Sequence, residues 1–213
     1  MDALLAELTA IAGPEHVLTD PDLVVGYTTD WTHRYTGLAT CVVTPGSAAE
    51  LADVVRACAA DGARIIPQGG NTGLVGGGVP VTGGAVVLSA RRLRRLDPVD
   101  ILSGQVTAGA GVTIAELRAH ATRAGLEYGV DLAARDSATV GGTIATNAGG
   151  IQTIRYGPTR AQLLGLEAVL ADGSVISRLG GIQADNTGYD LTQLLAGSEG
   201  TLGVITAAAS TSR

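Results

Sequence analysis

The sequence predicts an α+β fold of two consecutive units, in which short strands and helices are joined by glycine-rich loops. Three observations support this: a strand–helix–strand pattern at 40–67, a second mixed pattern from about residue 95, and glycine clusters between the strands. We place one subdomain at about 20–94 and another at about 95–213, so that residues 1–213 form a single domain.

The first unit follows an amphipathic helix at 2–12 that a Gly-Pro pair ends. Ser47 is expected to cap the next helix, which runs through Ala59, with Glu50 as the capping-box partner. Apolar runs predict the strands of this unit, at 41–44, 63–67 and 85–89.

The second unit contains a capped helix and a strand hairpin. Thr113 and Glu116 predict a capping box for a helix that extends to about Ala124. Asp172 and Gly173 are typical of the tight turn of a hairpin. The elements expected here are a strand at 105–111, an irregular glycine-rich stretch at 140–150, the hairpin at 163–177, a helix at 191–195 and a strand at 201–209.

Composition excludes several classes of protein. Hydrophobic residues make up 46% of the chain and charged residues 16%, which suits a packed interior. There is no Phe and one Trp, so the chain lacks the stacking platforms of single-stranded nucleic-acid binders. The arginine run at 91–95 is short and lies in an acidic chain, so we interpret it as a solvated strand end and expect no nucleic-acid partner.

Targeting and cysteine features favour a cytoplasmic location. No apolar run reaches the ~18 residues of a transmembrane segment, and the N-terminus lacks the basic region of a signal peptide. Cys41 and Cys58 lie in apolar segments without metal-ligand spacing. We therefore expect two reduced, buried thiols, no metal site and no transmembrane segment.

The charges are unevenly distributed along the chain. The net charge is −6, and all 14 basic residues are Arg. Residues 62–96 and 137–166 contain no Asp or Glu, and these windows hold the densest glycine clusters. This pattern favours an anion at the glycines, with chance and the low charge of buried segments as the alternative.

Three glycine-rich segments carry the functional prediction. Loop 1 (67–78) follows a strand, and its glycines allow main-chain N–H groups to surround a phosphate, with Asn71 and Thr72 as further donors. Loop 2 (136–150) consists mostly of small residues, so its main-chain amides could line a flat ligand, or the segment could simply pack tightly. Loop 3 (197–205) leads into an apolar strand. Taken alone, loop 1 is also compatible with a flexible surface hairpin.

Two other nucleotide-binding motifs are excluded. A P-loop requires a Lys after its glycines, and the chain contains no Lys. A GxGxxG dinucleotide turn requires a helix directly after the glycines, and no helical periodicity follows loop 1.

Four motifs together resemble one family. PQGGNTG, DSATVGGTIATNAGG, YGPTRAQLLGLEAVLADG and DNTGYDLTQLLAGSEGTLGVIT occur in this order in the FAD-linked oxidases of the vanillyl-alcohol-oxidase/p-cresol-methylhydroxylase type. The resemblance is strongest to the branch with D-2-hydroxyglutarate dehydrogenase, D-lactate dehydrogenase and the glycolate oxidase flavoprotein subunit. It covers the chain from about residue 20 and implies a PCMH-type FAD-binding domain, with FAD between two α+β subdomains.

The resemblance implies three sets of cofactor-binding residues. The set that wraps the FAD diphosphate is Pro67, Gln68, Gly69, Gly70, Asn71, Thr72, Gly73 and Leu74. The set along the ribityl chain and flavin edge is Asp131, Leu132, Ser137, Gly141, Thr146, Asn147 and Gly149. The set on the adenine and diphosphate side is Glu199, Gly200, Gly203, Val204 and Ile205.

Two positions depart from the family pattern. Relatives with covalent flavin carry a His where Asn71 stands, so a non-covalent cofactor is expected. Relatives also carry a Lys where Ala184 stands, which puts any role of that Lys near the flavin in doubt.

The resemblance further implies a parent reaction. The parent would oxidise a D-2-hydroxy acid to a 2-keto acid, with hydride transfer from Cα to flavin N5. Its electron acceptor would be an electron-transfer flavoprotein, a cytochrome or a quinone.

The substrate-binding part is expected to be missing. In this family a C-terminal cap domain binds the substrate and supplies a His base, and the chain is expected to end before that domain. His16, His33 and His120 lie outside the three loops and are interpreted as ordinary loop or surface residues. We therefore expect no catalytic residue in this chain and no activity from the chain alone.

Two alternatives remain open. The FAD domains of UDP-N-acetylenolpyruvoylglucosamine reductase and of molybdenum hydroxylases are related, but their glycine loops differ from PQGGNTG. A cap-less flavin-binding subunit or module of another flavoenzyme is the non-enzymatic alternative.

Overall fold

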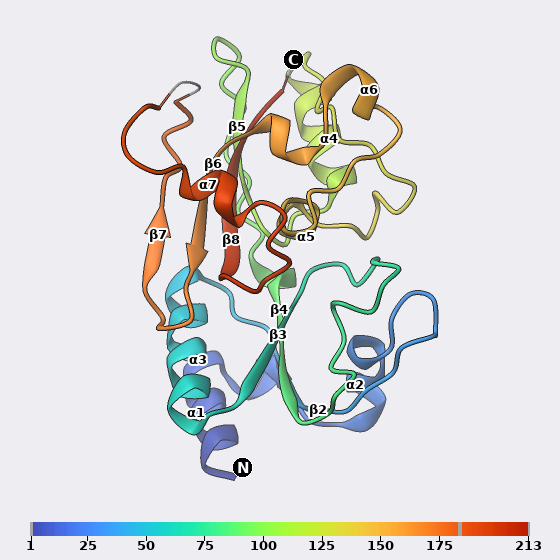
Figure 1. Cartoon of the computed structure of the whole chain (residues 1–213), viewed down its shortest axis with the longest axis vertical. Helices are drawn as coiled ribbons and strands as arrows, with labels where there is room; N and C mark the ends of the chain where they lie inside the picture. The colour runs from blue at the N-terminus through green and yellow to red at the C-terminus, as the bar shows by residue number, and fades with distance from the viewer. Residues whose placement is uncertain (1, 183–184, 213) are drawn as a thin grey trace.

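The chain folds around two four-stranded sheets that lie end to end along the molecule (Figure 1). The computed structural model describes residues 2–182 and 185–212, so Ala184 lies outside the described residues. The strand order is β1-β2-β4-β3 in the first sheet and β5-β8-β6-β7 in the second. Helices and strands are mixed in both halves, which confirms the predicted α+β class.

The first sheet consists mainly of parallel strands. Its strands are β1 (Val17–Leu18), β2 (Ala39–Val43), β3 (Arg64–Gln68) and β4 (Ala85–Ser89). The helical elements of this half are α1 (Asp2–Ala12), η1 (Pro14–His16), α2 (Pro21–Thr28), α3 (Ala48–Asp61) and η2 (Ala90–Arg92). β2, β4 and β3 run parallel to one another, and β1 is antiparallel to β2. All of β4 is buried, as expected for a strand between two neighbours under covering helices.

The parallel register determines where loop 1 leaves the sheet. Gln68 ends β3 and is paired with Ser89, which ends β4. Loop 1 therefore begins at the carboxyl end of the parallel strands. This is the edge at which open α/β sheets generally bind their ligands.

The second sheet is antiparallel throughout. Its strands are β5 (Gln105–Gly109), β6 (Leu163–Val169), β7 (Val175–Ser177) and β8 (Val204–Thr211). Its helical elements are α4 (Ile114–Arg123), α5 (Val140–Ala145), α6 (Thr153–Tyr156), η3 (Thr159–Gln162) and α7 (Leu191–Leu195). The β6–β7 hairpin turns at Gly173, where φ is 78°, as predicted. Within the described ranges, no helix combines the length and hydropathy needed to cross a membrane.

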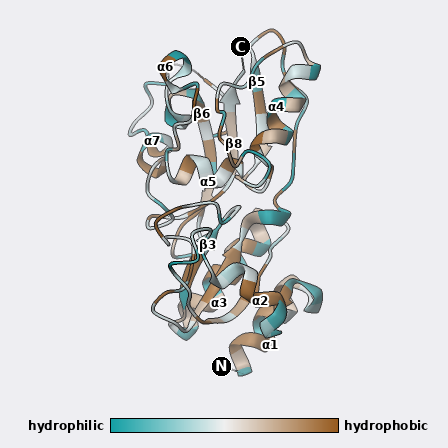
Figure 2. Cartoon of the chain, turned by 90° about the vertical axis from the view of Figure 1, so that its right-hand side faces the viewer, coloured by the Kyte–Doolittle hydropathy of each residue, from teal (hydrophilic) through white to brown (hydrophobic). Residues whose placement is uncertain are grey.

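One hydrophobic core connects the two sheets. Leu51 of α3 and Leu166 of β6 belong to the same buried cluster. The Arg56 guanidinium of α3 also donates a hydrogen bond to the Gly173 carbonyl at 2.8 Å. Figure 2 shows the hydrophobic segments along β5 and β6. The subdomain boundary near residue 94 stays a prediction.

Side-chain caps explain where two of the helices begin. The predicted box at α4 is confirmed: Thr113 Oγ1 accepts from Glu116 N at 3.2 Å, and Glu116 Oε2 accepts from Thr113 N at 2.9 Å. At α3, Ser47 Oγ accepts from Glu50 N at 3.1 Å, also as predicted. The Glu50 carboxylate accepts from Gly46 N at 2.8 Å and not from the N–H of the cap residue, so the prediction of a full capping box at α3 was wrong. An arginine of η2 lies 3.7 Å from the same carboxylate and attracts it away from the cap.

The stretch 140–150 is more regular than its glycines suggested, because it begins with α5. Thr139 Oγ1 caps this helix by accepting from Gly142 N at 3.3 Å. A Cβ at Gly141 would lie only 2.6 Å from the Ala110 Cβ, so the helix packs closer than a side chain would allow. Glycine disfavours helix locally, and tertiary packing overrides that preference here. Helices α2 and α6 were likewise not predicted.

The two cysteines lie in the core of the first unit, as predicted. Cys41 on β2 and Cys58 on α3 are fully buried, and both thiols are free. Burial raises the pKa of Cys41 to about 11 and that of Cys58 to about 12, from an ordinary value of 9.0. Thiols with so high a pKa are poor nucleophiles near neutral pH.

These pKa shifts predict a loss of stability in alkali. Folding favours the protonated thiols, so their contribution is fully present below pH 9.0 and is lost as the pH rises towards about 11. We expect the free energy of unfolding to fall above pH 9 by up to about 1.4 kcal/mol per pH unit for each thiol. Urea unfolding of the wild type and of Cys58→Ala across this range measures the slope. An equally steep fall in the variant would contradict the assignment to Cys58.

Candidate functional site

The side chains of loop 1 hold the end of α2. Gln68 Nε2 donates to the Tyr27 carbonyl at 2.8 Å and to the Gly78 carbonyl at 2.6 Å. Asn71 Nδ2 donates to the Thr29 carbonyl at 2.8 Å. Carbonyls at a helix C-terminus have no partner within the helix, and these amides supply one. The Asn71 side chain therefore anchors the loop. Its amide group already donates within the protein and is not free for the predicted role as a phosphate donor.

The main chain of loop 1 has unused donors. In the described part of the chain, the N–H groups of residues 71–75 donate to no protein acceptor. Residues 73–75 are exposed, and Asn71 has a positive φ of 54°. A run of successive free amides on a glycine-rich turn is the usual main-chain device for binding an anion.

The amides of loop 2 are mostly occupied. Gly141 N donates to the Ala110 carbonyl at 2.9 Å, and Val140 N donates to the Val112 carbonyl at 2.9 Å. The N–H groups that follow are used within α5 or at its ends. Of the two interpretations of this segment, tight packing is therefore the one that the structure supports for residues 140–148.

Loops 1 and 2 touch main chain to main chain. A Cβ built on Gly70 would overlap the Ser137 carbonyl oxygen. A Cβ built on Gly69 would overlap the Thr139 hydroxyl and approach the Gly142 Cα to 3.4 Å. No residue other than glycine fits at these two positions unless the loops separate.

Loop 3 contacts both of the other loops. Gly197 N donates to the Ile144 carbonyl at 3.0 Å, and Glu199 N donates to the Ala145 carbonyl at 2.9 Å. A Cβ on Gly200 would lie 2.9 Å from the Pro67 ring, at the base of loop 1. The three loops, which are far apart in the sequence, therefore meet at one place.

Unfavourable backbone conformations gather at this meeting point. In the described ranges, four residues other than glycine have positive φ: His33, Asn71, Asn147 and Glu199. The last three lie in loops 1, 2 and 3 respectively. Such conformations are costly for residues with a side chain and tend to cluster at functional sites.

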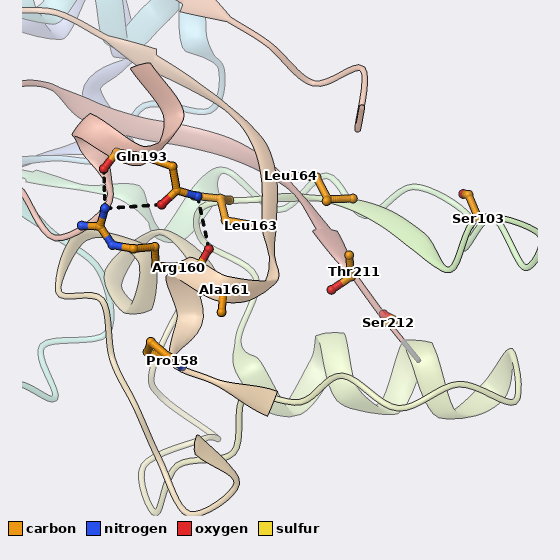
Figure 3. Close-up of a pocket in the computed structure, with 9 residues that line it drawn as sticks. All are labelled: Ser103, Pro158, Arg160, Ala161, Leu163, Leu164, Gln193, Thr211 and Ser212. Carbon is orange, nitrogen blue, oxygen red and sulfur yellow. Dashed lines mark hydrogen bonds between the residues drawn. The ribbon is translucent and has the colours of Figure 1, made fainter. Parts of the chain in front are cut away.

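Arg160 joins loop 2 to α7 and loop 3. Its main-chain N donates to Asn147 Oδ1 at 3.0 Å, and its Nη1 donates to the Gln193 carbonyl at 2.7 Å. Its Nη2 donates to the Ala196 carbonyl, directly before loop 3. Figure 3 shows this guanidinium bound to Gln193. Sequence reasoning gave Arg160 no role, although it lies in one of the four motifs, because its partners lie in other segments of the chain.

A cavity lies beside Arg160 and Gln193 (Figure 3). Its volume is about 480 Å³. It is lined by Ser103, Pro158, Arg160, Ala161, Leu163, Leu164, Gln193, Thr211 and Ser212. None of the predicted cofactor-binding residues lines it, so it is separate from the meeting point of the loops.

Asp131 and Leu132 belong to the wall behind loop 2. The Asp131 carboxylate is buried and lies 2.9 Å from Arg135 Nη1. Its carbonyl accepts from Ile151 N at 3.0 Å, and a Cβ on Gly150 would lie 3.1 Å from Leu132. The Asp131 side chain thus forms an ion pair with Arg135, and its main chain contacts the end of loop 2.

The predicted residues divide by exposure. The exposed or half-buried ones that remain open to a ligand are Thr72, Gly73, Leu74, Ser137, Thr146, Gly149 and Glu199. The buried ones are Gln68, Asp131, Gly141, Val204 and Ile205. The remainder sit at the loop contacts described above or at their edges: Pro67, Gly69, Gly70, Asn71, Leu132, Asn147, Gly200 and Gly203. The buried group positions the open group.

Comparisons with known proteins find similar sequences and structures. The family model described as "FAD binding domain" matches residues 39–178. D-2-hydroxyglutarate dehydrogenase, mitochondrial, of Danio rerio is 42% identical over 91% of this chain and 36% of its own length. D-2-hydroxyglutarate–pyruvate transhydrogenase of Saccharomyces cerevisiae is 36% identical over 95% of this chain and 41% of its own length. The chain thus spans between a third and a half of these relatives.

Solved structures share the fold. An alkyldihydroxyacetonephosphate synthase superposes with a TM-score of 0.87 at 23% identity, over 100% of this chain and 40% of that chain. p-Cresol methylhydroxylase superposes with a TM-score of 0.82 at 20% identity, over 99% of this chain and 43% of that chain. These likenesses establish the predicted PCMH-type fold.

Gly70→Ala is expected to separate loops 1 and 2. The new methyl group would overlap a carbonyl oxygen, so the free energy of unfolding should fall by about 1–3 kcal/mol. Gly73→Ala is the matched control, because a Cβ there meets nothing within 4 Å. Its stability should stay within about 0.5 kcal/mol of the wild type. Urea unfolding measures both, and equal effects in the two variants would contradict the packing described.

Asn71→Asp is expected to weaken the attachment of α2 to loop 1, leaving the bond from Gln68 to the Tyr27 carbonyl. A carboxylate cannot donate to the Gly26 and Thr29 carbonyls, which Asn71 Nδ2 contacts at 3.3 and 2.8 Å. We expect a loss of about 1–3 kcal/mol at neutral pH and faster amide exchange in α2. Protonating the Asp at acidic pH should reduce the difference from the wild type. Asn71→Gly tolerates the positive φ and isolates the loss of the two hydrogen bonds.

Proposed function

The chain belongs to the family of FAD binding domains, and we propose that it is the cofactor-holding part of a flavin-dependent D-2-hydroxy-acid dehydrogenase. The observation that carries the proposal is the run of free amides in loop 1, held in place by loops 2 and 3. The dehydrogenase names of the relatives support the reaction class.

The residues of loop 1 fit the diphosphate of FAD. Residues 62–96 contain no carboxylate, and the chain has no Lys, so main-chain dipoles are the natural counterpart of the two phosphates. Contacts that only glycine permits keep the loop in one place, so little ordering is needed on binding. We assign the diphosphate to the N–H groups of residues 71–75.

The remaining open residues fit neutral parts of the cofactor. Ser137 at the start of loop 2 and Thr146 at the end of α5 are exposed and carry hydroxyls. Thr146 donates its proton to the Gly142 carbonyl at 2.9 Å, which leaves its oxygen as an acceptor. We assign these two residues to the ribityl and flavin side. Asn71 has an amide side chain that hydrogen-bonds to α2, so the cofactor is held non-covalently at this position.

We assign to this chain's residues the binding and orientation of the cofactor, and to another part of the parent protein the removal of the substrate's proton. FAD, when bound, supplies the two-electron acceptor for oxidation of a CH–OH group. None of the three histidines lies in the loops; His120 Nε2, for example, lies 2.9 Å from the Asp97 carbonyl oxygen. We therefore propose that the general base and the substrate-binding groups belong to another part of a longer parent protein.

The partners and the location follow as proposals. The substrate class is a D-2-hydroxy acid such as D-2-hydroxyglutarate, and the electrons pass to an electron-transfer flavoprotein, a cytochrome or a quinone. Several relatives are named as mitochondrial proteins, whereas we predicted a cytoplasmic location for this chain. Cell fractionation distinguishes the two.

Flavin uptake tests the proposed function. The purified chain, incubated with FAD and then desalted, should retain the visible absorption of bound flavin. Gly70→Ala should bind FAD about tenfold more weakly, because a loss of 1.4 kcal/mol in binding free energy raises the dissociation constant by that factor. Gly180→Ala, at a position outside the three loops where a Cβ meets nothing within 4 Å, should behave as the wild type. A wild-type chain that takes up no FAD would refute the proposal.

Turnover tests the assignment of the general base. The flavin-loaded chain should not bleach when D-2-hydroxyglutarate or D-lactate is added under anaerobic conditions. The longer parent protein should bleach with one of them. Rapid bleaching of the chain alone would show that it contains its own base.

A further inference from the structure

The cavity beside Arg160 contains a positive charge and no negative one. Its volume is about 480 Å³, and its lining includes one Arg but no Asp or Glu. In the described part of the chain, the Arg160 guanidinium forms no ion pair and binds only neutral oxygens of Gln193 and Ala196. Arg160 is half-buried, and a cation that is partly withdrawn from water favours an anion beside it.

The Arg160 guanidinium retains N–H groups for such an anion. Nη1 donates to the Gln193 carbonyl at 2.7 Å and to Gln193 Oε1 at 3.3 Å. Nη2 donates to the Ala196 carbonyl. A guanidinium carries five N–H groups, so the N–H of Nε and one N–H of Nη2 have no acceptor among the described residues. These two groups are available to an acceptor in the cavity.

Two hydroxyls on the other side of the cavity also lack partners. Thr211 ends β8 and Ser212 follows it, and both line the cavity. Thr211 Oγ1 and Ser212 Oγ are buried, and neither has a hydrogen-bond partner within the described ranges. Figure 3 shows these side chains across the cavity from Arg160. Because a buried hydroxyl without a partner is unfavourable, the pair indicates a polar group that the fold itself does not supply.

The wall between the two polar ends is apolar. Leu163 and Leu164 of β6 line the cavity and lie between Arg160 and Thr211 in Figure 3. A single arginine balances a single negative charge, so a carboxylate suits this end better than a phosphate dianion. A ligand that fills the cavity therefore has a carboxylate, an aliphatic middle and a neutral polar group at its far end.

We propose that this cavity binds a short aliphatic carboxylate with a hydroxyl at its other end. The carboxylate accepts from the free N–H groups of Arg160, the hydroxyl bonds to Thr211 and Ser212, and the aliphatic part packs on Leu163 and Leu164. None of the predicted cofactor-binding residues lines the cavity, so this site is a second one that does not depend on the proposed function.

Short ω-hydroxycarboxylates test the proposal. The probes are 4-hydroxybutyrate, 6-hydroxyhexanoate and 8-hydroxyoctanoate, each titrated by calorimetry into the flavin-free chain. At least one should bind. The amide of the probe that binds best should bind about tenfold more weakly, because it loses hydrogen bonds to a charged group. The analogue without the hydroxyl should bind about fivefold more weakly, because it leaves the two hydroxyls without partners.

Variants of the cavity wall separate binding from a structural role. The double variant Thr211→Val/Ser212→Ala removes both hydroxyls, so without ligand it should melt at the wild-type temperature or higher. It should bind the best probe and the analogue without the hydroxyl equally well. Leu164→Trp fills the cavity and should abolish binding. Leu194→Trp is the matched control, because Leu194 of α7 is 60% exposed and does not line the cavity.

Amide hydrogen exchange locates the bound probe. Exchange should slow around Arg160 and Ser212 and stay unchanged at residues 71–75 of loop 1. Protection confined to loop 1 would overturn the inference, because main-chain amides would then hold the carboxylate. Absence of binding by all three probes would also overturn it, as would a double variant that melts lower or still prefers the hydroxyl. Because the titrations use the flavin-free chain, failure of FAD uptake would refute the proposed function and leave these results standing.

Discussion

The structure depends on the close approach of main chain to main chain where three loops meet. Gly70 leaves room for the Ser137 carbonyl, and Gly200 leaves room for the Pro67 ring. A methyl group at either position would force the loops apart, and loop 1 would lose its support. Other glycines, such as Gly73, face open space and serve a different purpose. Steric demand at a few contacts therefore positions the free amides that give the site its chemistry.

The hydrogen-bonding groups around the site have separate roles. The side chains of Gln68 and Asn71 bind the carbonyls at the end of α2, and the amides of loop 2 bind within α5 and to the strand region beside it. Arg160 binds the carbonyl of Gln193 within α7 and that of Ala196 directly after it. These hydrogen-bonding groups therefore already have partners within the protein. Loop 1 keeps a run of uncommitted N–H groups on a glycine-rich turn, and this is why a ligand anion is expected there and not at loop 2.

The electrostatics of the site rest on dipoles and the exclusion of acids. An acidic chain without Lys holds no carboxylate in residues 62–96, so no acid of the same segment opposes the field of the loop 1 amides. The acid that does lie close to loop 1 is Glu199 of loop 3, whose Oε2 is 3.5 Å from a Cβ built on Gly77 and whose φ of 52° is unfavourable.

Sequence alone determined the α+β class, most strands, the capping box at α4, the buried thiols and the three glycine segments. These features depend on local periodicity, turn chemistry and caps, which neighbouring residues specify. Only the tertiary structure decided that α5 is a helix, that Asn71 faces α2, that Arg160 joins loops 2 and 3, and which amides remain free. Each of these depends on contacts between distant segments, and a carbonyl or a Cβ brought in from elsewhere in the fold leaves no trace in the local sequence.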